Sequence, residues 1–176
     1  MRRSAPKPSS ESFGMPDTFY WDSCVFLSAV NGDAGRLPHI ESFLDSASKG
    51  DVVILTSTVS KVEVAFGAAE QLSQALDPAV ENKINELWDT GSPVKLVEFH
   101  ELLAEDARAL MRQALTKGWS LRPLDAVHLA TAMRYKSDRF HTYDAGLQKF
   151  SGQIGITIEE PISPTPMLPM SPGHSP

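Results

Sequence analysis

Short runs of β-branched and aromatic residues alternate with longer amphipathic stretches through the middle of the chain. The run Val52-Val53-Ile54-Leu55 is continuously apolar, which is typical of a strand covered on both faces of a sheet. The other runs are bounded by polar, charged or turn-forming residues. Together they predict five strands, over residues 18–21, 52–55, 94–99, 139–143 and 154–158.

The stretches between these runs repeat apolar residues every three or four positions, as amphipathic helices do. Gly50 and Gly118 follow two of the stretches and predict helix ends. A helix is expected to start from N-cap oxygens in Thr56-Ser57-Thr58 and to run to about Leu76. The other predicted helices cover about residues 23–30, 40–49, 78–88, 101–117 and 125–136, and a short one follows Asp144.

Strand and helix alternate over the whole of this region. Such alternation implies right-handed crossovers between parallel strands, with helices on both faces of the sheet. The sequence therefore predicts an α/β fold, a three-layer α/β/α sandwich with a mainly parallel sheet. In sheets of this kind, functional sites form beyond the carboxyl ends of the strands.

The two ends of the chain differ in composition from its middle. Residues 1–16 are rich in serine and proline, and residues 161–176 contain six prolines. Proline removes a backbone donor and disfavours helix in the residue before it. We therefore expect a flexible arm over residues 1–16, one folded domain over 17–160 and a disordered tail over 161–176.

Charge and cysteine content narrow the possible functions. The chain has 176 residues and a formal net charge of −6. This charge argues against a protein that coats nucleic acid through bulk electrostatics, but it is compatible with a cluster of carboxylates. A single cysteine, Cys24, excludes an internal disulfide and a cysteine-rich zinc site. No apolar run approaches the roughly 20 residues that span a bilayer. We expect a cytoplasmic protein that does not contact a membrane.

Three acidic residues lie where predicted strands end or helices begin. Asp22 directly follows the first strand, Asp144 follows the fourth, and Asp125 opens a helix that is apolar almost all round. Each of them could simply cap a helix, which is a common use of aspartate. Carboxylates that are distant in sequence but gather at one edge of a sheet suggest a divalent-metal site.

A fourth acid, Glu63, falls beside a predicted apolar stripe. A carboxylate on a core-facing helix is costly unless it is paired or bound to a metal. The alternative is a capping box, because Ser60-Lys61-Val62-Glu63 matches the S-x-x-E pattern. The predicted stripe consists of Val59, Val62, Phe66 and Ala69.

Two other polar side chains lie near these acids in sequence. His128 is part of the helix that Asp125 opens, where it could be a ligand, although a core histidine hydrogen-bonded to backbone is the simpler interpretation. Thr142 lies two residues before Asp144 and projects to the same side of an extended strand. Its hydroxyl could hold a carboxylate or a water on the metal.

The segments that carry the four acids resemble those of PIN-domain ribonucleases, particularly the VapC-type toxins of bacterial and archaeal toxin–antitoxin pairs. The likeness covers about residues 18–158 and places the four family acids at Asp22, Glu63, Asp125 and Asp144, with Thr142 at the accompanying hydroxyl position. The matching blocks are Tyr-Trp-Asp-Ser-Cys-Val-Phe-Leu (20–27), Ser-Lys-Val-Glu-Val-Ala-Phe-Gly (60–67), Leu-Asp-Ala-Val-His-Leu-Ala-Thr-Ala (124–132) and His-Thr-Tyr-Asp (141–144).

The resemblance implies a Mg²⁺- or Mn²⁺-dependent endoribonuclease that hydrolyses RNA phosphodiester bonds, a small antitoxin partner and a homodimer. We expect Asp22 and Asp125 nearest the main metal ion. The other two catalytic acids, Glu63 and Asp144, would then orient waters or a second metal ion. Ser23 and Thr142 are expected to support the acids. Arg122 is the first candidate for a contact with RNA phosphates, because its loop leads directly into Asp125.

Three other functions remain open. A phosphohydrolase of the haloacid dehalogenase type would need Asp-x-Asp after the first strand, and Cys24 occupies the position of its second aspartate. The main alternative is a catalytically silent PIN fold that only binds RNA or docks a protein. A housekeeping RNA-processing nuclease would share the chemistry but would need no antitoxin.

Overall fold

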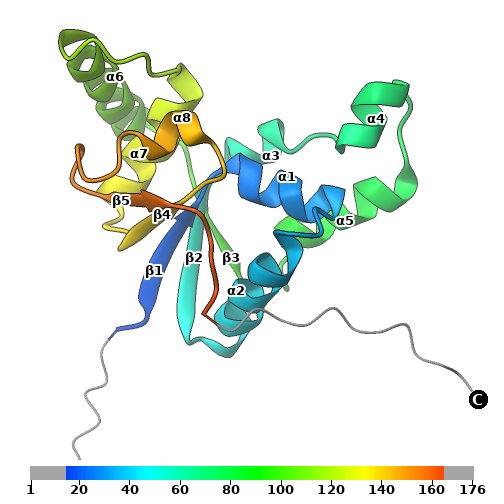
Figure 1. Cartoon of the computed structure of the whole chain (residues 1–176). Helices are drawn as coiled ribbons and strands as arrows, with labels where there is room; N and C mark the ends of the chain where they lie inside the picture. The colour runs from blue at the N-terminus through cyan, green and yellow to red at the C-terminus, as the bar shows by residue number, and fades with distance from the viewer. Residues whose placement is uncertain (1–14, 165–176) are drawn as a thin grey trace, which may run out of the picture.

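Five parallel strands form one central sheet in the order β3-β2-β1-β4-β5. The computed structural model describes residues 15–164 (Figure 1). The chain starts at the centre, adds strands on one side and then on the other, so the order reverses at β1. In open α/β sheets, the crevice at such a reversal is where ligands bind. The strands are β1 (Asp17–Trp21), β2 (Val52–Ser57), β3 (Val94–Val97), β4 (Arg139–His141) and β5 (Thr157–Glu159).

Helices cover both faces of this sheet and complete the predicted three layers (Figure 1). Along β1, Phe19 and Trp21 join the core under α1, α2 and α5, whereas Tyr20 joins the core under α7. This division follows from the two-residue period of a strand. The predicted fold class is therefore confirmed. The helices are α1 (Ser23–Asn31), α2 (Leu37–Lys49), α3 (Ser60–Glu63), α4 (Ala68–Ser73), α5 (Pro78–Trp88), α6 (Glu101–Thr116), α7 (Pro123–Arg134) and α8 (Ala145–Gln148).

The single helix predicted from residues 56–58 to about 76 is wrong. Strand β2 continues through Ser57, because the buried Thr56 hydroxyl donates to the Trp21 carbonyl (2.7 Å) across the sheet. The one-turn helix α3 follows without a side-chain cap, so no capping box involves Glu63. A second short helix, α4, begins after Gly67, whose N–H donates to the Glu70 carboxylate (2.9 Å).

The expected core-facing stripe around Glu63 is also wrong. The side chains of Val62 and Phe66 are 77% and 45% exposed, and Val64 is a buried apolar residue of this segment instead. The break between α3 and α4 explains the error, since a helical period has no meaning across two short helices. The position of the Glu63 carboxylate is therefore set by its hydrogen-bond partners and not by the apolar face of a helix.

Several element boundaries differ from the prediction. Helix α7 begins at Pro123, so Asp125 lies inside its first turn and does not cap it. Proline is favoured at this first position because its missing N–H has no helical partner. The predicted arm over 1–16 and tail over 161–176 lie almost wholly outside the described residues. Ser163 is nevertheless buried, and its N–H donates to His39 Nδ1 (3.1 Å), so packing continues beyond the predicted boundary at residue 160.

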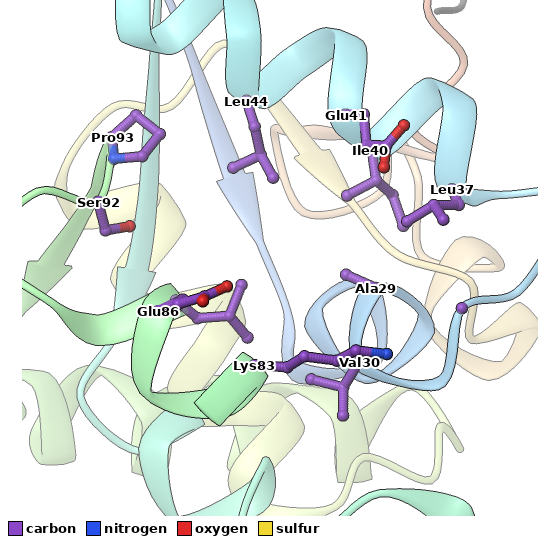
Figure 2. A pocket seen from close by; sticks show the side chains of 12 residues that line it. Ala29, Val30, Leu37, Ile40, Glu41, Leu44, Lys83, Glu86, Ser92 and Pro93 are labelled. Atoms are coloured by element: carbon purple, nitrogen blue, oxygen red, sulfur yellow. The ribbon is translucent and has the colours of Figure 1, made fainter. Parts of the chain in front are cut away.

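A hollow lies between α1, α2, α5 and the turn before β3, with Ile40, Leu44 and Lys83 among its lining residues (Figure 2). In the part of the chain that the structure describes, none of the predicted site residues lines it. The hollow is thus separate from the acids. Within residues 15–164, no helix is both long enough and apolar enough to cross a membrane.

Candidate functional site

Asp22 lies at the carboxyl end of β1, at the centre of the sheet, and is almost fully buried. Its carboxylate caps α1 by accepting from the Cys24 N–H (3.0 Å), and it also accepts from the Cys24 thiol (2.8 Å) and the Thr142 hydroxyl (2.5 Å). Burial raises the pKa of Asp22, and the hydrogen bonds from Cys24 and Thr142 oppose that rise. The capping interpretation is therefore correct, and it leaves the carboxylate at the strand end where a site was expected.

Thr142 joins Asp22 to Asp144. The buried Thr142 hydroxyl donates to Asp22 Oδ2 and accepts from the Asp144 N–H (2.9 Å). Because Thr142 directly follows β4, the neighbour of β1, this bond fixes two adjacent strand ends relative to each other. The hydroxyl that the sequence singled out thus holds a carboxylate.

Glu63 lies at the end of α3 with its side chain partly exposed. Its Oε2 accepts from the Ser23 hydroxyl (2.5 Å) and lies 2.6 Å from His128 Nε2. Burial alone would raise the pKa of Glu63, but the hydrogen bonds from His128 and Ser23 outweigh it, and the pKa is lowered. Ser23, the residue after Asp22, therefore supports Glu63 and brings it to the same strand end.

His128 is a site residue that the sequence analysis did not assign. It is buried as expected, but its partners are side chains: Tyr20 Oη at 2.7 Å from Nδ1, and Glu63 Oε2 from Nε2. The interpretation as a histidine bonded to backbone is wrong. The available signal was its spacing, because residues three apart lie on the same face of a helix and His128 is three after Asp125.

Arg122 bridges the remaining two acids. Its guanidinium donates to both carboxylate oxygens of Asp125 (2.7 and 3.1 Å) and to Asp144 Oδ2 (2.8 Å). The Arg122 side chain is 70% exposed, whereas those of Asp125 and Asp144 are 16% and 34% exposed. Asp144 also caps α8 by accepting from the Gly146 N–H (2.7 Å). The sequence placed Arg122 near Asp125 but did not predict this bridge.

Contacts link all four predicted acids into one continuous set. Asp22 reaches Asp144 through Thr142, and Asp144 reaches Asp125 through Arg122. Ser23 follows Asp22 directly and donates to Glu63, whose pKa the charge of Arg122 also helps to lower. The set therefore occupies one edge of the sheet, as the strand ends predicted.

The donor chemistry of this set fits a hard divalent cation. All four acids and both hydroxyls offer oxygen, the ligand that Mg²⁺ and Mn²⁺ prefer. Among residues 15–164, however, no three histidine, cysteine or acidic side chains lie close enough together to hold a metal ion. The guanidinium of Arg122 instead supplies the positive charge between Asp125 and Asp144. Joint binding of a metal by these two acids would require Arg122 to release them.

A family model described as the PIN domain matches residues 19–153, well over half of the chain. No curated protein sequence matches the chain. Solved structures share the fold at low sequence identity. The VapBC2 complex of Rickettsia felis bound to a DNA fragment from its promoter is similar, with 14% identity, a TM-score of 0.58, and coverage of 81% of this chain and 97% of that chain.

Two further solved structures show the same fold. DNA-bound VapBC from Salmonella typhimurium gives 16% identity and a TM-score of 0.58, covering 82% of this chain and 98% of that chain. VapC20 of Mycobacterium tuberculosis, described as a toxin that cleaves the sarcin–ricin loop, gives 13% identity and a TM-score of 0.55, covering 74% and 93%.

Proposed function

Because the chain belongs to the PIN-domain family, we propose that it is a divalent-metal-dependent endoribonuclease that hydrolyses RNA phosphodiester bonds. The observation that carries the proposal is the linked set of Asp22, Glu63, Asp125 and Asp144 at the carboxyl edge of the parallel sheet. A nuclease that works through a metal needs such oxygen donors and needs neither a serine nucleophile nor a histidine base.

Mg²⁺ or Mn²⁺ would be held by the four acids, with Asp22 and Asp125 nearest to it. When bound, the ion supplies positive charge that stabilises the negative charge developing on the phosphate. The protein contributes the geometry. Thr142 and the α1 backbone aim the carboxylate of Asp22, and Ser23 and His128 aim that of Glu63. Carboxylates held in this way need no rearrangement during the reaction.

Arg122 would have a second role once the acids hold a cation. Its exposed guanidinium could then donate to a phosphate, because arginine recognises carboxylates and phosphates with the same planar fork of donors. Single-stranded or looped RNA is the expected substrate, since an A-form duplex hides its base edges in a deep groove. This is the RNA contact that the sequence predicted for Arg122.

We further propose that the chain is the toxin of a type II toxin–antitoxin pair, with a small antitoxin and a second copy of the chain as partners. Support comes from the relatives named above, of which two are described as VapBC complexes and one as a toxin. Coexpression of the adjacent open reading frame tests this: relief of growth arrest is expected, and the absence of arrest without that partner would contradict a toxin role.

One observation favours a second candidate, a catalytically silent module that binds RNA or a protein. The guanidinium of Arg122 forms ion pairs with two of the four acids, Asp125 and Asp144. RNA cleavage assays separate the two functions. A nuclease loses cleavage in EDTA and regains it with Mn²⁺, and the Asp22→Asn variant remains inactive under both conditions. Cleavage that persists unchanged in EDTA would overturn the proposal, and RNA binding without any cleavage would support the module.

A further inference from the structure

A chain of hydrogen bonds runs from the middle of the sheet to Glu63. The Ser57 N–H, at the end of β2, donates to Tyr20 Oη (3.0 Å), which lies 2.7 Å from His128 Nδ1. On the other side of the ring, His128 Nε2 lies 2.6 Å from Glu63 Oε2. Tyr20, Ser57 and His128 are all buried, so water does not compete for these bonds.

The direction of each bond follows from the available protons. The Tyr20 oxygen accepts from Ser57, and burial raises the pKa of Tyr20, so its hydroxyl keeps a proton to donate. If Tyr20 donates that proton to His128 Nδ1, 2.7 Å away, then Nδ1 is the acceptor nitrogen of the ring. The other nitrogen, Nε2, would then carry the ring proton and donate it to Glu63. A neutral imidazole has one donor and one acceptor, so Tyr20 selects the tautomer that serves Glu63.

Glu63 depends on such support because its own helix cannot orient it. Helix α3 is a single turn without a side-chain cap, and Glu63 is its last residue. Both hydrogen bonds to the carboxylate fall on Oε2, from Ser23 and His128. Among the residues that the structure describes, none donates to Oε1, which leaves that oxygen for a ligand.

We propose that His128 is a positioning residue and that Tyr20 acts through it, so that a relay Ser57–Tyr20–His128 fixes the carboxylate of Glu63 for the reaction. The kinetic consequence rests on the proposed nuclease function, but the relay itself does not. Outer hydrogen bonds of this kind orient the groups that act directly, and their loss costs roughly 10–100-fold in affinity or activity. The relay reaches Glu63 from β1, β2 and α7 together, so three elements of the core would set one carboxylate.

Replacement of Tyr20 by phenylalanine tests the relay, because it removes only the hydroxyl. The matched control is Tyr143→Phe, since the buried Tyr143 hydroxyl has no hydrogen-bond partner within residues 15–164. Tyr20→Phe is expected to lower kcat for RNA cleavage by about 10-fold with little change in KM, whereas the control stays within about twofold of wild type. Equal activity of the two variants would overturn the proposal.

A double-mutant cycle excludes a general loosening of the core. If Tyr20 acts through His128, then Tyr20→Phe added to His128→Leu lowers kcat by less than about twofold, because coupled residues are not additive. A loss as large in this background as in wild type would mean that Tyr20 has only a structural role. His128→Gln retains an N–H donor and is expected to be more active than His128→Leu.

Nitrogen-15 NMR of the histidine rings shows which ring nitrogen of His128 carries the proton, and it needs no RNA. In the wild-type protein, His128 is expected to carry its proton on Nε2, with Nδ1 as a hydrogen-bond acceptor, and Tyr20→Phe is expected to remove the bond at Nδ1. Assignment follows from the signal that is lost in His128→Gln. A proton on Nδ1 of the wild-type ring would overturn the relay. If the wild-type protein cleaved no RNA at all, the proposed function would be wrong. The NMR signals of the His128 ring nitrogens would still show whether the relay exists.

Discussion

The inner pair of acids, Asp22 and Glu63, is held by buried side chains of the core, whereas the outer pair, Asp125 and Asp144, is held by one exposed cation. The hydroxyls of Thr142 and Ser23 and the imidazole of His128 are all buried. These groups orient the two carboxylates from within the core. The inner pair is therefore held in place by the fold itself.

The outer pair is organised in the opposite way. Arg122 supplies a full positive charge, and its side chain is 70% exposed to solvent. Two of its donors meet Asp125, whose side chain is only 16% exposed, so this bridge is stronger than a fully exposed ion pair, which contributes about 0–1 kcal/mol. The difference teaches that one half of the site is preformed, while the other half is closed by an arginine bridge. Each prediction below tests one side of this contrast.

The largest effect is expected at Asp22. Asp22→Asn removes a negative charge from the preformed half and should lower RNA cleavage by at least about 100-fold, the upper range for groups that only support a metal ligand. Asparagine still caps helices well, so the fold should persist. Asp77→Asn is the matched control, since Asp77 caps α5 by accepting from the Ala79 N–H (2.8 Å). Cleavage by Asp22→Asn at the level of Asp77→Asn would remove Asp22 from the mechanism.

The next effect is expected at Thr142, which supports the inner pair from β4. Thr142→Val keeps the shape of the side chain but removes the hydroxyl that bonds Asp22, and kcat should fall by about 10-fold. Thr142→Ser keeps the hydroxyl and should retain most of the activity. Steady-state kinetics on one RNA substrate compare the two. Equal losses in both variants would mean that packing of the methyl group matters and the hydrogen bond does not.

A smaller effect is expected from the metal on folding stability. A cation that binds only the folded protein at ten times its Kd adds about 1.4 kcal/mol. For a chain of this length, such a gain raises Tm by about 3–6 °C. The shift should appear with Mn²⁺ in thermal unfolding and disappear in Asp22→Asn. An unchanged Tm in millimolar Mg²⁺ and Mn²⁺ would contradict a metal site at the inner pair.

The sequence predicts which acids lie at strand ends better than it predicts the side chains that hold them, and the reason is physical. Asp22 follows a continuous apolar run, and Thr142 stands two residues before Asp144 along an extended segment, so local pattern alone places all three at strand ends. The helix predicted to run to residue 76 fails because Thr56 bonds the backbone of β1, a contact across the sheet that local pattern does not contain.

Contacts between side chains that are far apart in the sequence also cannot be predicted from the local pattern of residues. His128 meets Tyr20 and Glu63, which are 108 and 65 residues away in the chain. Arg122 meets Asp144 only after α7, β4 and the turn before α8 have all packed. The residue types were therefore predictable from sequence, while the identity of the group that neutralises the outer acids required the structure.

The smallest effect is expected at this bridge, and it gives the sharpest test of the contrast. If Arg122 competes with a cation for Asp125 and Asp144, then Arg122→Gln removes the competitor and should strengthen Mn²⁺ binding by about threefold, which corresponds to an ion pair within the range of about 0–1 kcal/mol. The same change should weaken RNA cleavage, because the guanidinium would no longer contact a phosphate.

The affinity for Mn²⁺ measured by isothermal titration and the rate of RNA cleavage would thus change in opposite directions. Arg134→Gln is the control, since Arg134 pairs with Asp106 (2.6 Å) on the surface between α6 and α7, away from the four acids. Weaker Mn²⁺ binding by Arg122→Gln would show that the arginine organises the outer pair for the metal, and the two halves of the site would then differ in exposure but not in kind.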